Sequence, residues 1–442
     1  MCENSFGMRH FRAFPYPEKV ELAPSHASEL AREEHDEEKG SNGGRSIYNG
    51  SCPGCEKGGT MNYPVGPTEA YYGAKLLEML RGAWPKVQKR FQFYLSQYFY
   101  RDTLVKAFLF ERDFSDLPKT EFIDYRCYLD YYASDIKPVT LRMGSTDKTL
   151  KLPYREEINF IESPSAQINV VGSITDYNMP QALRELTENN LRAYLRVQPQ
   201  SWDNPILRVS SFVRQDSTHY ECSLERSTYY YQARTNLTID CPLEGEAAKT
   251  LRTLDLGPSN SLRSLEDSIL VNSIGVSAVV FFRKSGDIYF FMKYRRGTEG
   301  VFGHMFGTTS GVVTLPKGQP VRSLVDYVYT EMRREFYRET GFDEDRDRLP
   351  IRNMVLLSFA RELMRGGKPQ FFFVIEIDEI DERQFKTKFR TSAEGLQEFH
   401  DDLYHNNKYS AVLSPEFATN LIYALQFFQS EKRLSADPVL LG

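Results

Sequence analysis

The most informative segment of this chain reads Arg334-Glu335-Phe336-Tyr337-Arg338-Glu339-Thr340-Gly341-Phe342. Its spacing predicts a helix on which Glu331, Glu335 and Glu339 fall within an arc of about 80°. Three carboxylates at such short distances repel one another unless a cation lies among them. A divalent metal ion, bound together with phosphate oxygens, would supply that cation. A solvated charged face with internal arginine counterions explains the spacing equally well.

The composition is that of a globular chain long enough for two domains. It has 442 residues, of which 41% are hydrophobic and 26% charged. A net charge of −5 argues against a nucleic-acid partner. The segment before Val20 has no secretory apolar region, and no apolar run approaches the roughly 20 residues of a membrane helix. We therefore expect a cytoplasmic protein without a membrane partner.

The sequence of the first 265 residues predicts a disordered region followed by a folded domain. Residues 1–60 carry acidic and Gly/Ser/Asn-rich runs with little to bury, so we expect a disordered N-terminal extension. Residues 62–265 predict an α+β domain of unassigned role with a largely antiparallel sheet. Its expected elements are two helices between Thr68 and Tyr100 and strands at Leu207–Arg214, Tyr220–Leu224, Thr228–Ala233 and Leu237–Asp240.

Residues 270–442 predict a second unit of mixed helices and strands. Lys284-Ser285-Gly286-Asp287 is a hairpin turn signal between two apolar runs, and Gly341 is well placed to end the helix of the charged segment. The expected elements are strands at Val276–Phe282, Ile288–Tyr294, Met354–Phe359 and Phe371–Ile377, a glycine-bearing loop at Gly307–Gly318, a helix at Ser323–Thr340, and a last helix capped by Ser414.

This second unit resembles the Nudix hydrolase superfamily. The family signature is G-x5-E-x7-R-E-U-x-E-E-x-G-U, in which U is a bulky apolar residue. Here Arg334-Glu335-Phe336 matches R-E-U, Glu339 matches the second glutamate of the pair, and Gly341-Phe342 matches G-U. The resemblance implies an α/β/α sandwich with a mixed sheet across residues 270–442, and it does not extend to residues 1–265.

The chain departs from the signature at three positions. Arg338 stands where the family has the first glutamate of the pair, and Asp326 stands at the upstream acidic position. At the strict spacing of the signature, Pro320 stands where the family has its opening glycine. Gly311 is a more plausible equivalent if the loop carries an insertion.

The resemblance implies hydrolysis of a phosphoanhydride bond in a nucleoside-diphosphate-linked or similar substrate, with Mg²⁺ or Mn²⁺. Glu335 and Glu339 would be the metal ligands, and Arg334 would orient a carboxylate. From its position one turn before Glu335, we infer that Glu331 could replace the missing carboxylate. Either Glu331 or Glu362 could act as the general base.

Four residues are candidate substrate contacts. Arg361 and Lys368 belong to the segment Arg361–Pro369, whose cations and Gly-Gly pair could hold an anion, although a polar hairpin loop explains them equally. Gly311 and Arg338 come from the Nudix-like region. Arg295 follows the predicted strand Ile288–Tyr294. Like the cations of the segment Arg361–Pro369, it could hold an anion or could simply belong to a polar loop.

Arg338 leaves three interpretations open. It could replace one metal ion and bind phosphate, repel metal so that the domain binds a ligand without cleaving it, or bridge Glu331 and Glu335 or point into solvent. The alternative function is therefore a catalytically inactive Nudix-fold module that binds a nucleotide-like ligand or a protein partner. Self-association as a homodimer is left open.

Overall fold

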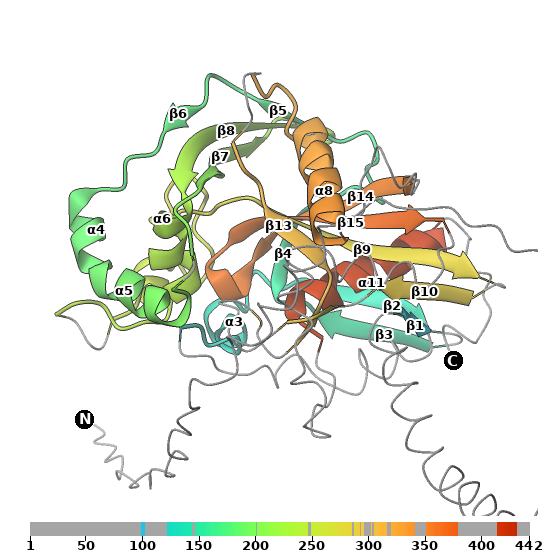
Figure 1. The fold of residues 1–442 in the computed structure, drawn as a ribbon, viewed down its shortest axis with the longest axis horizontal. Coiled ribbons are helices and arrows are strands. Elements are labelled where there is room, and N and C mark those ends of the chain that lie inside the picture. The colour runs from blue at the N-terminus through green and yellow to red at the C-terminus, as the bar shows by residue number, and fades with distance from the viewer. Residues whose placement is uncertain are drawn as a thin grey trace, which may run out of the picture. The chain divides into compact units, whose positions relative to one another are not determined.

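The structure is a computed structural model, drawn in Figure 1, and every described residue belongs to one compact unit, Lys75–Gly442. The predicted boundary at residues 265–270 falls inside this unit. The predicted extension at residues 1–60 and Gly341 lie outside the described residues. The described residues are 99–101, 122–143, 146–199, 201–245, 249–284, 287–291, 293–295, 302, 305–315, 320–340, 351–378 and 413–430.

Seven of the described strands form one mixed sheet, in which β9 and β15 are parallel and the other pairs antiparallel. β13 and β10 share one edge of β9, because β13 pairs with its first half and β10 with its second. The order is β1 (Phe99–Arg101), β10 (Asp287–Phe291), β9 (Gly275–Lys284), β15 (Lys368–Ile377), β14 (Ile351–Glu362) and β4 (Tyr154–Asn159), with β13 (Thr309–Val312) beside β9.

Helix α8 (Leu324–Thr340) covers one face of this sheet (Figure 1). The Ser323 hydroxyl caps its first turn by accepting a hydrogen bond from Asp326 N at 3.2 Å. Alternate residues of β9, such as Val276, pack with Phe336 in the core beneath α8. The predicted helix is confirmed, and it reaches the sheet through its apolar side.

Helix α11 (Pro415–Ser430) packs against the other set of alternate residues of β9. Phe281 meets Phe428 edge-on, with ring centroids 4.8 Å apart. The Ser414 hydroxyl caps the helix by accepting from Phe417 N at 3.1 Å, as predicted. No helix in the described part of the chain is long and apolar enough to cross a membrane.

A second, four-stranded sheet comes from the middle of the chain. The predicted hairpin is confirmed as β7 (Pro205–Arg214) and β8 (His219–Thr228). β5 (Gln167–Val170) and β6 (Thr175–Asp176) run parallel to β8, so the prediction of a largely antiparallel sheet is wrong here. A tight turn forces antiparallel pairing, whereas the long connections from β5 and β6 to β8, which include two helices, allow parallel pairing. These helices are α4 (Gln181–Leu186) and α5 (Glu188–Val197).

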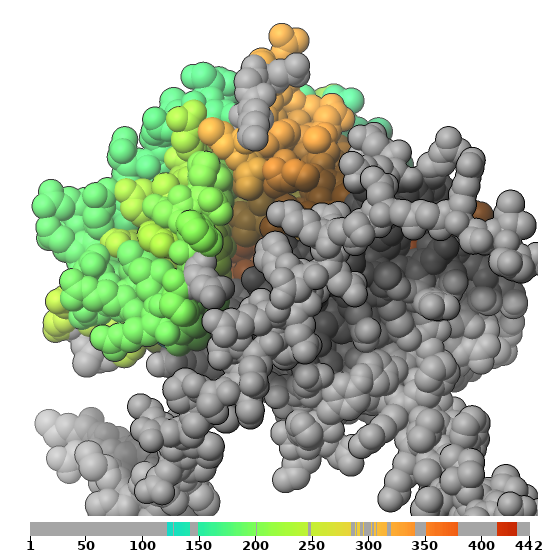
Figure 2. Space-filling model, viewed as in Figure 1, coloured from blue at the N-terminus to red at the C-terminus, as the bar shows by residue number. Residues whose placement is uncertain are grey.

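Backbone hydrogen bonds join the two sheets. Leu207 N donates to Val313 O at 3.1 Å, and Ile274 N donates to Leu207 O at 3.0 Å. Val170 N, in β5, donates to Arg322 O at 2.9 Å, just before α8. On the face drawn in Figure 2 the green and orange parts of the surface accordingly adjoin. Residues from both predicted segments also contribute to both large hydrophobic clusters, which contain Phe281 and Val276 respectively.

Three predicted helices or strands are wrong in the described residues, and the loop predicted at Gly307–Gly318 contains strand β13. Phe99 and Tyr100 were expected in a helix but form β1 against β10, because tertiary pairing outweighs local pattern in an aromatic run. Residues expected as strands at 228–240 form α6 (Tyr229–Arg234) and η2 (Asn236–Thr238). Tyr229, Ala233 and Leu237 recur at a spacing of four and pack on one core, which favours helical turns.

The remaining described elements are short. They are α3 (Cys127–Tyr131), the hairpin β2 (Pro138–Met143) and β3 (Thr146–Lys151), α7 (Leu251–Leu254), the pair β11 (Lys293–Tyr294) and β12 (Phe306–Gly307), and the turn η3 (Leu363–Arg365) between β14 and β15.

Candidate functional site

The three glutamates of α8 share one buried face, as their spacing predicts. Glu331, Glu335 and Glu339 are 4%, 2% and 4% exposed. Ser310 N donates to Glu339 Oε2 at 3.1 Å, and Thr314 N donates to Glu331 Oε2 at 2.9 Å. The carboxylates therefore hold α8 against β13 and the residues that follow it.

Two arginines of the same helix form ion pairs with Glu331 and Glu335. Arg334 Nη2 lies 2.8 Å from Glu331 Oε2 and 3.0 Å from Glu335 Oε1. Arg338 Nε donates to Glu335 Oε2 at 2.9 Å, and its side chain is 51% exposed. The bridge between Glu331 and Glu335, considered above for Arg338, is made by Arg334. Both oxygens of Glu335 accept a guanidinium hydrogen bond.

The donor set does not fit the divalent metal ion that the resemblance implies. Within the part of the chain that the structure describes, no three His, Cys, Asp or Glu side chains gather so that they could hold a metal ion. Glu335, the first predicted ligand, has both oxygens bonded to arginine, and Glu339 Oε2 accepts from backbone. Burial raises the pKa of Glu331, which would weaken it further as a ligand for a cation.

Gly311 lies between these carboxylates and a pocket. A Cβ added at Gly311 would lie 2.4 Å from the carboxyl carbon of Glu335 and 2.5 Å from its Oε2, so only glycine permits this approach. The same residue also lines the pocket. Of the four predicted substrate contacts, Gly311 is thus one that reaches a cavity.

The pocket has a volume of about 270 Å³. Its walls come from α5, α6, β13, the hairpin β14–β15 and α11. Three cations line it, accompanied by one carboxylate and a pair of tyrosines whose hydroxyls are 2.8 Å apart. These residues are Arg295, Arg365, Lys368, Glu416, Tyr194 and Tyr229.

Lys368 is buried at this pocket and 2% exposed. Its Nζ donates to Gln370 Oε1 at 3.0 Å, and Gln370 Nε2 donates to Glu416 Oε1 at 3.1 Å. A Cβ added at Gly275 would lie 2.3 Å from Nζ, so the ammonium lies directly on that glycine. Burial lowers the pKa of Lys368 to about 7, and the positive charge of Arg365 contributes to the same shift.

Each arginine of the pocket has a carboxylate beside it. Arg365 Nε donates to Glu362 Oε2 at 2.6 Å, and Arg295 Nη2 lies 3.6 Å from Glu416 Oε2. Arg295 also donates to Ser310 Oγ at 2.6 Å. Glu362, a predicted general base, is fully buried in its ion pair and is not among the pocket-lining residues.

Arg361 and Arg338, predicted as substrate contacts, are not among the residues that line this pocket. Arg361 pairs with Pro369 in the ladder, one step from the Glu362–Lys368 pair, so its side chain leaves the opposite face of the hairpin. There it is buried, donates to Gly367 O and Arg263 O at 3.0 and 2.7 Å, and its pKa falls to about 10 through burial.

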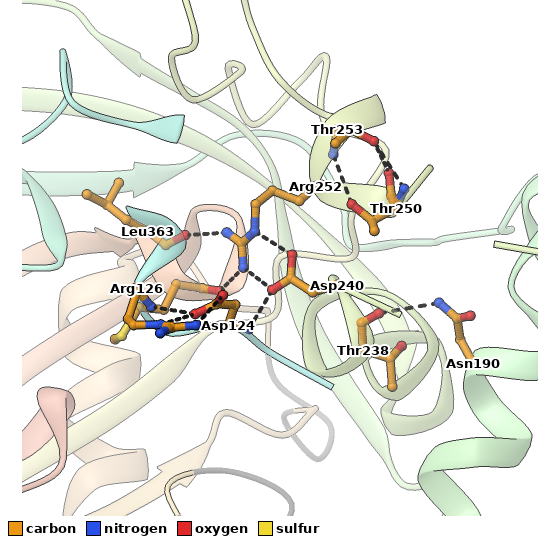
Figure 3. A network of polar contacts seen from close by, with 10 residues as sticks. Asp124, Arg126, Asn190, Thr238, Asp240, Thr250, Arg252, Thr253 and Leu363 are labelled. Atoms are coloured by element: carbon orange, nitrogen blue, oxygen red, sulfur yellow. Dashed lines mark hydrogen bonds and ion pairs between the residues drawn. The ribbon is translucent and has the colours of Figure 1, made fainter. Parts of the chain in front are cut away.

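A buried arginine fixes the turn that carries Arg365. Figure 3 shows Arg252 between Asp240 and the carbonyl of Leu363. Its guanidinium lies 2.7 Å from both oxygens of Asp240 and donates to Leu363 O and Met364 O at 3.1 and 2.7 Å. Arg252 therefore holds the carbonyls of η3 in place. No motif in the sequence indicated this residue.

Sequence reasoning noted Arg295 and Arg365 only as cations of hairpin loops, and it missed Tyr194, Tyr229 and Glu416. These three come from separate helices and carry no local signal. No protein-family model matches the sequence, and a search of curated proteins gives no significant match.

Proposed function

We propose that this chain is a divergent Nudix-type module that binds a nucleotide-like ligand in the pocket beside β13. The observation that carries the proposal is the position of Gly311, which lies against Glu335 of the Nudix-like helix and also lines the pocket. The mixed sheet with a helix on each face supports the resemblance of residues 334–342 to the Nudix signature. Cations, amides and tyrosines around one cavity suit a ligand with an anionic and a polar part.

Binding without cleavage is favoured over hydrolysis by the contacts of α8. Arg334 and Arg338 hold both oxygens of Glu335, and no glutamate of α8 is among the pocket-lining residues. A metal ion would have to displace these guanidinium groups. The competing hypothesis is the Mg²⁺- or Mn²⁺-dependent cleavage of a phosphoanhydride.

The experiment compares wild type with Glu335→Gln on a panel of nucleoside diphosphate derivatives. Binding is measured by calorimetry with and without Mg²⁺, and phosphate release is measured on the same samples. We expect binding that does not require metal and phosphate release at background for both proteins.

Glu266→Gln is the matched control, since Glu266 is exposed and carries the same change of charge. Mg²⁺-dependent phosphate release by wild type and Glu266→Gln, lost in Glu335→Gln, would instead establish the hydrolase. Absence of binding to every compound of the panel would contradict the proposed function.

A further inference from the structure

The charges around the pocket do not balance. Arg365 has Glu362 beside it and Arg295 has Glu416. Lys368 forms no ion pair in the described ranges, and its hydrogen bond goes to the neutral amide of Gln370. Among the described residues, and with Lys368 protonated, three cations of the pocket face two carboxylates.

A buried ammonium without a counterion is unfavourable. One hydrogen bond to an amide does not offset its desolvation, and the described residues offer no hydrogen-bond partner to its other two N–H donors. The lowered pKa of Lys368 is the expected response of such a group. Nζ nevertheless fits at this position because Gly275 has no side chain there.

We propose that Lys368, together with Arg295 and Arg365 of the same pocket, binds the phosphate group of a small molecule, and that this phosphate is the counterion that Lys368 lacks. The inference deepens the proposed function and rests on it for the class of ligand. The ammonium and two guanidinium groups supply donors around one cavity, which is how proteins hold phosphate oxygens. The volume of about 270 Å³ lies near the lower end of the range for ligand pockets, which favours a small ligand.

Binding is then coupled to protonation. The charged groups that face Lys368 are Arg365 from η3, Glu362 from β14 and Glu416 from α11, and of these Arg365 opposes its protonation while the two carboxylates favour it. An added phosphate favours the protonated form. We expect proton uptake on binding near pH 7, and an affinity that falls as the pH rises above 7.

Inorganic pyrophosphate is the probe for the site, titrated by calorimetry into wild type, Lys368→Met, Lys368→Arg and Lys151→Met. Lys151 is exposed, so its variant is the control for loss of a positive charge. We expect at least tenfold weaker binding for Lys368→Met and unchanged binding for Lys151→Met. Lys368→Arg should restore binding, because its side chain keeps the charge.

Sulfate serves as the second probe, because its own charge is constant between pH 6 and pH 8.5. Wild type should lose affinity for sulfate roughly 30-fold over this range if only protonated Lys368 binds. Lys368→Arg should show a flat profile, since arginine stays charged. This measurement decides the question even where Lys368→Met fails to fold.

Pyrophosphate that binds Lys368→Met as tightly as wild type, or that does not bind wild type, would overturn the inference. A flat sulfate profile for wild type would do the same. If pyrophosphate binding depends on Lys368 but no nucleoside diphosphate derivative binds, the proposed function is refuted and the phosphate site is supported. If nucleotides bind equally well with and without Lys368, the proposed function is supported and the phosphate site is refuted.

Discussion

The carboxyl group of Glu335 lies directly on the backbone of Gly311. Its carboxyl carbon is 2.4 Å from the position that a Cβ at residue 311 would take. The contact joins the charged helix α8 to the strand that lines the pocket. It also explains why a glycine is needed in β13, where the backbone is otherwise extended and paired with β9.

Gly311→Ala should destabilise the protein by about 1–3 kcal/mol, because Glu335 is held by two arginines and cannot move away freely. Chemical denaturation measures the change in free energy of unfolding. The matched comparison is the same substitution in a Glu335→Ala background, where the overlap is absent and the cost should shrink. An equal cost in both backgrounds would show that the contact with Glu335 is not the cause.

Arg252→Lys should lower the free energy of unfolding by about 2–3 kcal/mol. Lysine cannot reproduce the fork that bonds both oxygens of Asp240 and the carbonyls of Leu363 and Met364. Arg192→Lys, at an exposed pair with Glu188, is the control and should change stability little. Similar losses for the two variants would argue against a special role for Arg252.

Lys368→Met should stabilise the protein without ligand, by about 2–4 kcal/mol at pH 6. The pKa of Lys368 in the folded protein is about 7, below the ordinary value of 10.5. The unfolded chain therefore binds more protons between these values, and wild-type stability rises with pH across this range. The advantage of the variant should be full below pH 7 and shrink towards pH 10. Denaturation from pH 6 to pH 9.5 measures it, and an advantage that grows with pH would contradict the assignment.

Mg²⁺ should leave the unfolding temperature of the protein unchanged. A ligand that binds the folded state raises that temperature, whereas the α8 carboxylates are already bonded to arginine and backbone. Differential scanning fluorimetry with Mg²⁺, Mn²⁺ and EDTA tests this. A metal-dependent rise that Glu335→Gln abolishes would indicate a metal site at α8.

Asn236→Ala should destabilise the protein by about 2–4 kcal/mol. Asn236 is fully buried, and its amide donates to Asn272 Oδ1 and Arg365 O at 3.1 and 2.8 Å while accepting from Asn272 N at 3.0 Å. Truncation leaves buried polar groups without partners. Asn204→Ala, at an exposed position, is the control. A small, equal effect of both substitutions would show that solvent replaces the lost bonds.

The sequence by itself determined the local elements whose pattern is strong. The apolar runs of β9, β10, β14 and β15 predicted strands, and the cap at Ser414 predicted where the last helix begins. Helical spacing also placed Glu331, Glu335 and Glu339 on one face, because that arrangement depends only on the turn of the helix. These features need no knowledge of distant residues.

Only the tertiary structure decided which residues those elements meet. Pairing of β1 and β4 with the main sheet follows from contacts between distant segments. The pocket brings Arg295, Lys368 and Glu416 together from three parts of the chain. Lys368 and Arg361 lie on opposite faces of the β14–β15 hairpin because side chains alternate along a strand. Arginines of α8 bind Glu335, which the sequence had predicted as a metal ligand. Spacing along the chain fixes a face, whereas burial and charge pairing across the fold decide what that face binds.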